Sequence, residues 1–324
     1  MTRILLIGAA GQVGQELQAI LPNLGEMISL DRQTLDLTQV EQIRQSIRQW
    51  QPHYIVNAAA YTAVDRAESE PELANQINAI APTVIAQEAQ ALNALLLHLS
   101  TDYVFDGYSY RPYRVEDSTQ PLSVYGQSKL AGEMGIRQVG DRHVILRTAW
   151  VYGVHGKTNF VKTMLRLGST QEELRIVADQ IGSPTWATDI AQTLGQLITW
   201  DRDRASPSAE NRTGAPEYDR PVVQGTFHFT NSGVASWYDF TVAILEEAEA
   251  LGLPVLTKRI LPITTADFPT SARRPAYSVL DHRPLWPILG CPPRHWRQAL
   301  RSMLQQYSLM IAAPTASSDS SSDA

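Results

Sequence analysis

Tyr125 and Lys129 are the residues whose types and spacing best suit catalysis. They stand four positions apart in a helix-like stretch, so both side chains lie on one helix face. An ammonium group placed there lowers the pKa of a phenol from about 10 toward neutral pH. Thr101 follows a strand-like run and brings a hydroxyl that can hold a carbonyl group. Together the three side chains suit the reduction of a ketone, with the proton supplied by the tyrosine.

A glycine-rich turn stands upstream of these residues. Gly8, Gly11 and Gly14 follow an apolar run and precede a helical pattern, the context in which such a turn binds a dinucleotide. Glycines let the backbone approach a pyrophosphate, and the helix N-terminus supplies amide donors. We therefore expect the cofactor contacts of this turn to come from Gly8, Gly11, Gln12, Val13 and Gly14. A purely structural turn is the alternative.

The residues that follow the second and third strands are candidates for the remaining cofactor contacts. Asp31 comes 20 residues after Gly11, where a carboxylate can bind the adenosine ribose. Arg32 could instead accept a 2′-phosphate, so the sequence leaves NADPH and NADH both open. Asp36 and Leu37 are expected beside the adenine. The small residues Ala58, Ala59 and Ala60 would let the backbone pass close to the cofactor, although a tight strand-to-helix turn explains them as well.

The first half of the chain alternates short apolar runs with helix-periodic stretches, which predicts an α/β fold with a Rossmann-like, doubly wound parallel sheet. Apolar residues that continue through each run indicate strands buried on both faces. The predicted strands are Arg3–Ile7, Met27–Leu30, Tyr54–Asn57, Leu95–Ser100 and His143–Thr148, and the predicted helices are Gln12–Leu21, Thr38–Gln49, Pro71–Leu92 and Val124–Gln138.

The pattern loosens after Trp150. We expect a cofactor-binding domain over residues 1–150, a smaller and mainly substrate-binding domain over 151–312 with some segments returning to the first, and a disordered tail over 313–324. Residues 201–224 are expected to form an exposed excursion. Helices are predicted at Asn159–Leu167, Asp189–Trp200 and Trp237–Ala250.

Composition excludes several functional classes. A net charge of -6 disfavours nucleic acid and anionic membranes as main partners. No membrane span or signal peptide is readable, and the single Cys291 cannot form an internal disulfide, so a cytoplasmic location is expected. The seven histidines show no metal-ligand spacing, and His98 is better explained as a core or sheet-end histidine than as a zinc ligand.

The motifs together resemble the extended short-chain dehydrogenase/reductases, and among them the dTDP-4-dehydrorhamnose reductase family. The resemblance covers roughly residues 1–305. The matching segments are Gly8–Gly14, Val56–Asp65, Ser69–Glu72, Ser100–Asp106, Val124–Glu133, Arg147–Gly153, Asp179–Thr185 and Arg274–Leu280.

The resemblance implies NADPH or NADH as cofactor and a dTDP-4-dehydro-6-deoxy-L-hexose as substrate, whose 4-keto group is reduced. It assigns Thr101, Tyr125 and Lys129 to the catalytic positions. Tyr125 and Lys129 are also expected to contact the cofactor, Lys129 at the nicotinamide ribose. Arg273 and Arg274 are candidates for the diphosphate, and a salt-bridged loop is the alternative for Arg274. The implied substrate-binding residues are Thr62, Val64, Thr101, Asp102, Tyr103, Tyr125, Trp150 and Arg274.

The resemblance leaves some points open. A magnesium-bridged homodimer occurs in some relatives; Glu16 is compatible with it, but Thr188 stands where an acid is expected, so the sequence does not support a metal. Dehydratases carry a glutamate where Tyr103 follows Asp102, which favours simple reduction. Another sugar-nucleotide reductase, an epimerase or a non-catalytic regulatory subunit that binds NADP stay as alternatives.

Overall fold

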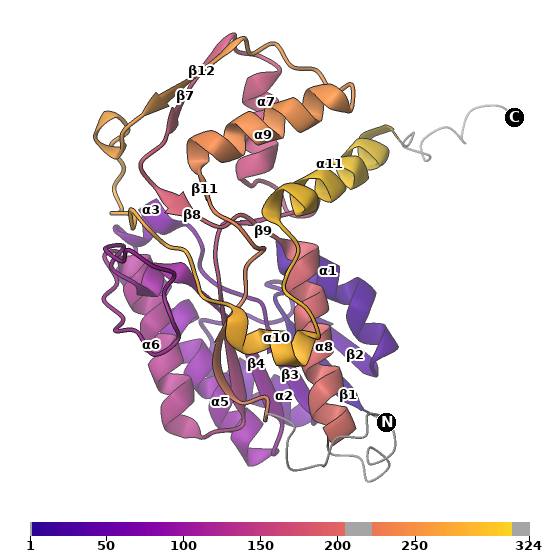
Figure 1. Cartoon of the computed structure of the whole chain (residues 1–324). Coiled ribbons are helices and arrows are strands. Elements are labelled where there is room, and N and C mark those ends of the chain that lie inside the picture. Colours follow the sequence, from indigo (N-terminus) through magenta and orange to yellow (C-terminus); the bar gives the residue numbers. More distant parts are fainter. Residues whose placement is uncertain (1, 205–221, 313–324) are drawn as a thin grey trace, which may run out of the picture.

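A parallel sheet forms the centre of the molecule. The computed structural model describes residues 2–204 and 222–312. Its six-stranded sheet has the order β10-β5-β4-β3-β1-β2 (Figure 1). The strands are β1 (Arg3–Ile7), β2 (Glu26–Leu30), β3 (Tyr54–Asn57), β4 (Leu95–Thr101), β5 (His143–Thr148) and β10 (Gly225–His228).

Helices cover both faces of this sheet, because successive side chains of each strand point to opposite sides. On one face α1 (Gln12–Ile20) and α8 (Ala187–Arg204) pack on Leu6, Val56 and Leu97. The other face carries Leu5, Ile55 and Leu96 and is covered by α2 (Val40–Trp50), α5 (Ala81–Ala91) and α6 (Val124–Val139). The expected α/β, Rossmann-like architecture is thus confirmed.

Short elements join these layers. A turn of π-helix (Gln76–Ile80) connects α4 (Pro71–Asn75) directly to α5, so one interrupted helix replaces the single helix predicted over Pro71–Leu92. The helix α3 (Val64–Ala67) and the four-residue α10 (Trp286–Leu289) complete this part.

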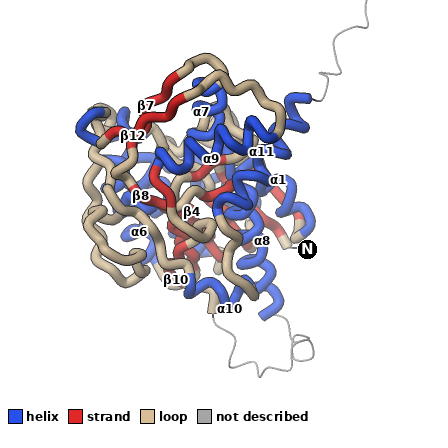
Figure 2. Tube along the Cα trace, turned by 45° about the horizontal axis from the view of Figure 1, so that its top comes forward, coloured by secondary structure: helices blue, strands red, loops and turns tan. Residues whose placement is uncertain are grey.

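A second hydrophobic core lies beyond the carboxyl edge of the sheet (Figures 1 and 2). It is built mainly from α7 (Phe160–Gly168), α9 (Trp237–Ala250) and α11 (Trp296–Ala312). Three two-stranded pairs surround it: β6 (Val151–Tyr152) with β9 (Thr185–Trp186), β8 (Ile181–Gly182) with β11 (Ala235–Ser236), and β7 (Glu173–Val177) with β12 (Arg259–Ile263).

The chain after residue 150 contributes to both parts. α8 packs on α1, and β10 pairs in parallel with β5, so these segments return to the sheet. α8 continues to Arg204, which makes the first four residues of the expected 201–224 excursion helical. Residues 205–221 of that excursion, and the tail from residue 313, lie outside the described residues. Within the described part of the chain, no helix is long and apolar enough to cross a membrane.

Candidate active site

The carboxyl ends of the parallel strands carry most of the predicted site. The chain order of the strands reverses between β1 and β3, the place where open α/β sheets bind ligands. The glycine turn follows β1, the alanine segment follows β3, and Thr101 ends β4. All three therefore meet at one edge of the sheet.

The glycine turn is closed by contacts that a side chain would break. Gly8 has a φ of +88°, and a Cβ there would lie 2.6 Å from the backbone nitrogen of Ala59. A Cβ on Gly14 would lie 2.1 Å from the carbonyl oxygen of Gly8. Gly11 stands at the N-terminus of α1. The turn therefore needs glycine to bring the segment after β3 against the start of α1, and this bare backbone fits a dinucleotide pyrophosphate.

The other two residues of the turn point to different surroundings. Val13 is buried in the core between the sheet and the helices α1 and α8. The Oε1 atom of Gln12 accepts a hydrogen bond from Nδ2 of Asn159 at 2.8 Å, and Asn159 is the N-cap of α7. The start of the glycine-turn helix is therefore tied directly to the second core.

Asp31 directly follows β2 and begins a tight polar turn. Its Oδ1 accepts from the backbone N–H groups of Gln33 and Thr34 and from the Thr34 hydroxyl, and these bonds lower the pKa of the carboxyl. Arg32 beside it is exposed. The carboxylate is thus committed in part to the turn, whereas the guanidinium faces solvent.

The two residues proposed beside the adenine have structural partners as well. The Asp36 carboxylate accepts from the backbone N–H and the hydroxyl of Thr38, each at 2.9 Å. Leu37 is buried among Leu30 and Ile43 in the core of the α2 face. Their contact with a cofactor stays a prediction.

Tyr125 lies in the first turn of α6, which is capped by the Ser123 hydroxyl. Its ring is buried and contacts the Tyr103 ring edge-on, with centroids 5.5 Å apart. Burial raises the pKa of Tyr125 to about 12, and a hydrogen bond with Thr101 opposes that rise. Burial, and not the lowering expected from Lys129, therefore dominates the pKa of Tyr125.

Lys129 follows one turn later on the same helix and is also buried. Its Nζ donates to the carbonyl oxygen of Leu99 at 2.7 Å and lies 3.1 Å from Nε2 of His98. Burial lowers the pKa of Lys129 to about 8. The three predicted catalytic residues thus gather where α6 meets the end of β4.

Asp102, the next residue after Thr101, is a buried carboxyl group whose ionised form costs stability. It is 2% exposed, and burial raises its pKa to about 6, although hydrogen bonds with Thr101 and Ser278 offset part of the rise. An acid whose folded-state pKa is raised costs stability above that pKa, and the cost vanishes below the unfolded-state pKa.

Replacing Asp102 by asparagine should therefore stabilise the protein at neutral pH. For Asp102→Asn we expect the free energy of unfolding at pH 7 to rise by about 3 kcal/mol, because the pKa is raised by about two units and each unit corresponds to about 1.4 kcal/mol. The gain should shrink as the pH falls through about 6 and disappear near 4. Urea unfolding of both proteins across this range measures it; an equal difference at both ends would contradict the assignment.

Trp150 has a left-handed backbone with φ of +49°, which is unusual for an aromatic residue. Its indole stacks on that of Trp237, with ring centroids 3.4 Å apart and planes at 3°. The pair joins the end of β5 to the first residue of α9. Trp150 thus takes part in core packing, and its indole is half-buried.

The remaining substrate candidates come from distant segments. Nη2 of Arg274 lies 2.7 Å from the Asp65 carboxylate, so the salt-bridged alternative describes this arginine. Arg273 stacks on the ring of Tyr108. Thr62 is exposed just before α3, and Val64 packs in the small cluster that includes Tyr125.

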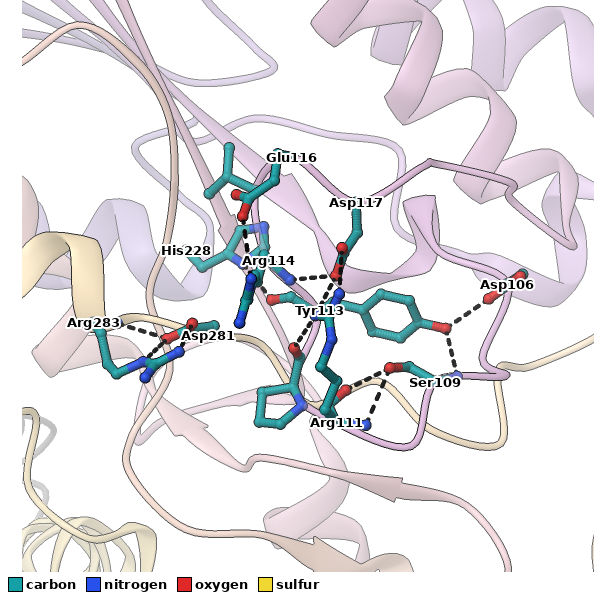
Figure 3. A network of polar contacts seen from close by, with 12 residues as sticks. Asp106, Ser109, Arg111, Tyr113, Arg114, Glu116, Asp117, His228, Asp281 and Arg283 are labelled. Atoms are coloured by element: carbon teal, nitrogen blue, oxygen red, sulfur yellow. Dashed lines mark hydrogen bonds and ion pairs between the residues drawn. The ribbon is translucent and has the colours of Figure 1, made fainter.

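The loop after Tyr103 is fixed by a network of polar contacts (Figure 3). The Tyr113 hydroxyl donates to Asp106 at 2.6 Å. The Tyr113 carbonyl accepts the backbone N–H of Asp281 at 2.8 Å and faces Nδ1 of His228 at 3.1 Å. A further ion pair joins Arg111 to Asp117 at 2.8 Å. The loop is therefore anchored to β10 through His228 and to the chain at Asp281.

Comparison with known proteins agrees with this geometry. The family model described as RmlD substrate binding domain matches residues 1–309. The dTDP-4-dehydrorhamnose reductase of Aggregatibacter actinomycetemcomitans is 41% identical over 305 residues, which cover 94% of this chain and 98% of the relative. The chain belongs to the dTDP-4-dehydrorhamnose reductase family.

Further relatives align over similar lengths. The spore coat polysaccharide biosynthesis protein SpsK of Bacillus subtilis is 41% identical over 309 residues, with 95% of this chain and 99% of the relative covered. The crystal structure of the Bacillus anthracis dTDP-4-dehydrorhamnose reductase in complex with NADP has a TM-score of 0.82 at 35% identity, covering 94% of this chain and all of that one (100%).

The sequence did not indicate a buried ion pair that joins α6 to β5 in this dTDP-4-dehydrorhamnose reductase fold. Glu133 lies on α6 one turn after Lys129, is fully buried, and accepts from Nε and Nη2 of Arg147 at 2.9 and 2.7 Å. It also accepts from the Ser100 hydroxyl at 2.6 Å. A charged pair at helical and strand-like positions gives no local signal, because only the fold brings α6 and β5 together.

Glu16 and Thr188, the positions weighed for a metal, lie on α1 and α8. Glu16 is buried, with Nε2 of His155 at 3.9 Å from its Oε1. Among residues 2–204 and 222–312 there is no group of three or more His, Cys, Asp or Glu side chains that could hold a metal ion.

Proposed function

We propose that this protein uses NADPH to reduce the 4-keto group of dTDP-4-dehydro-β-L-rhamnose, giving dTDP-β-L-rhamnose for cell-surface polysaccharides. The observation that carries the proposal is the meeting of Thr101, Tyr125 and Lys129 at the sheet edge that also holds the glycine turn. The name of the A. actinomycetemcomitans relative at 41% identity, dTDP-4-dehydrorhamnose reductase, supports the substrate class.

The chain's own residues account for the proton chemistry of this reaction. The bound cofactor supplies the hydride. Tyr125, kept protonated by its raised pKa, donates a proton to the carbonyl oxygen, and Thr101 orients that oxygen through its hydroxyl. Lys129 is buried on the same helix face. In its ammonium form, Lys129 stabilises the tyrosinate that remains after the proton transfer.

The substrate is proposed to lie between the sheet edge and the second core, near Tyr103 and Trp150. The half-buried indole of Trp150 suits the apolar face of a 6-deoxy sugar. We also propose that the chain divides into two domains at about residue 150. The protein is further proposed to form a homodimer and to be cytoplasmic. Light scattering of the purified protein tests the dimer.

Arg32 supports the choice of NADPH, and its replacement gives a specific test. It is exposed next to an aspartate whose carboxylate is partly used by its own turn. The B. anthracis relative was solved with NADP. For Arg32→Ala we expect KM for NADPH to rise about tenfold, the scale of one hydrogen bond to a charged group, with KM for NADH nearly unchanged. Equal effects on both cofactors would contradict a 2′-phosphate contact.

The reaction itself is tested by mixing the protein with NADPH or NADH and dTDP-4-dehydro-β-L-rhamnose. The loss of reduced nicotinamide absorbance gives the rate, and chromatography identifies the product. Formation of dTDP-L-rhamnose, faster with NADPH, is expected. Cofactor binding without turnover would favour a different keto sugar nucleotide or a regulatory role.

A further inference from the structure

A buried chain of hydrogen-bonding groups runs from β3 to the catalytic lysine. Asn57 ends β3 and is fully buried, and its Nδ2 lies 3.1 Å from Nδ1 of His98 on β4. The other ring nitrogen of His98, Nε2, lies 3.1 Å from Nζ of Lys129. His98 is also fully buried, so the imidazole bridges two side chains with no access to water.

The backbone fixes the direction of these hydrogen bonds. The N–H of Ala59 donates to Oδ1 of Asn57 at 3.1 Å, so the Nδ2 donors of Asn57 face His98. Nδ1 of His98 must therefore accept. Burial lowers the pKa of His98 well below its usual value, so the ring is neutral. A neutral imidazole carries one proton, which must then sit on Nε2 and point at Lys129.

Only one form of Lys129 completes this arrangement. A neutral amine has a lone pair that accepts the Nε2–H of His98, while one of its N–H groups donates to Leu99 at 2.7 Å. An ammonium has no lone pair and would face the ring with a second donor. A buried donor left without an acceptor costs about 1–3 kcal/mol, so the hydrogen bonds oppose the charged form.

The charged groups around Lys129 do not reverse this preference. Glu133 on the same helix raises the pKa of Lys129, but both its oxygens are engaged by Arg147. Tyr125 on α6 is protonated. Beyond β4, the surrounding groups are Asp102 after that strand and His143 on β5, whose own pKa burial lowers. Burial outweighs the opposing effect of Glu133 and lowers the pKa of Lys129 to about 8.

We propose that His98 is a positioning residue that acts through Lys129: its tautomer, fixed by Asn57, favours the neutral amine over the ammonium. This inference rests on the proposed reduction, in which the ammonium stabilises the tyrosinate of Tyr125. It gives the enzyme an alkaline limit close to physiological pH. Residues that never touch the substrate thus set the pH range of the reaction.

Nitrogen-15 NMR of the full-length protein with labelled histidine tests the tautomer without any activity measurement. We expect the His98 signals, identified by their loss in His98→Gln, to show the proton on Nε2. In Asn57→Asp the carboxylate accepts from Nδ1–H, so the proton should move to Nδ1. A wild-type ring that carries its proton on Nδ1 would overturn the inference, even if the protein reduced no dTDP sugar.

The pH profile of kcat/KM tests the consequence for catalysis. In His98→Gln the amide oxygen can accept from the ammonium, so the alkaline limb should move up by about one pH unit, the shift that about 1.4 kcal/mol corresponds to. His143→Gln is the matched control, because His143 is a buried histidine on the next strand that contacts the Gly140 carbonyl and should leave the limb in place. An unmoved alkaline limb in His98→Gln would overturn the proposal.

Discussion

Tyr125→Phe should lower turnover at least about 100-fold, the usual contribution of a positioned general acid, and leave the affinity for NADPH unchanged. Phenylalanine keeps the buried ring and its edge-on contact with Tyr103, so only the hydroxyl is lost. The measurement is steady-state turnover together with cofactor binding by fluorescence. Near-normal turnover would exclude Tyr125 as the proton donor.

Tyr61→Phe is the matched control for this experiment. Tyr61 packs in the same cluster as Tyr125, but its hydroxyl donates to Glu70 at 2.5 Å. We expect this variant to retain turnover within a few-fold. A loss equal to that of Tyr125→Phe would show that the cluster, rather than one hydroxyl, controls the rate.

Arg147→Met should destabilise the protein by about 3–5 kcal/mol, because it leaves the buried Glu133 without its main counter-charge. Arg147 is 2% exposed, and its guanidinium also lies 5.1 Å from the centre of the Phe105 ring. The Ser100 hydroxyl and the more exposed Arg137 are the partners left to Glu133. Chemical unfolding of the variant measures the loss.

The double variant Arg147→Met/Glu133→Leu separates the loss of a charge partner from poor packing. Removing both charges avoids the buried, uncompensated carboxylate, so most of the lost stability should return. A single variant that loses less than about 1 kcal/mol, or a double variant no more stable than the single one, would contradict this account.

The local sequence pattern predicted the strands and helices that have a clear run of apolar residues or a clear helical period. The runs around Leu5, Ile55 and Leu96 are apolar over three or four consecutive positions, which predicts strands covered on both faces. β10 escaped prediction because Gly225–His228 has no such run: it is a strand only because it pairs with β5. α8 was placed correctly but ended too early, because Asp201–Arg204 is polar yet still helical.

The candidate site divides in the same way. Spacing along α6 predicted that Tyr125 and Lys129 share a face, and the fold brings Thr101 to them. The pKa of Tyr125 could not be predicted, since it depends on burial by the whole cluster. Arg274 pairs with Asp65, 209 residues earlier, which no local pattern could indicate. Only the folded chain shows which polar groups are already engaged.

The spacing of side chains along α6 has a consequence for evolution and for protein engineering. Tyr125, Lys129 and Glu133 follow one another at steps of four residues, so the reacting end and the buried anchor share one stripe. Inserting or deleting one residue between them would rotate one end by about 100° relative to the other. Variation in this segment should therefore take the form of substitutions. A change in its length should abolish activity even where the helix still forms.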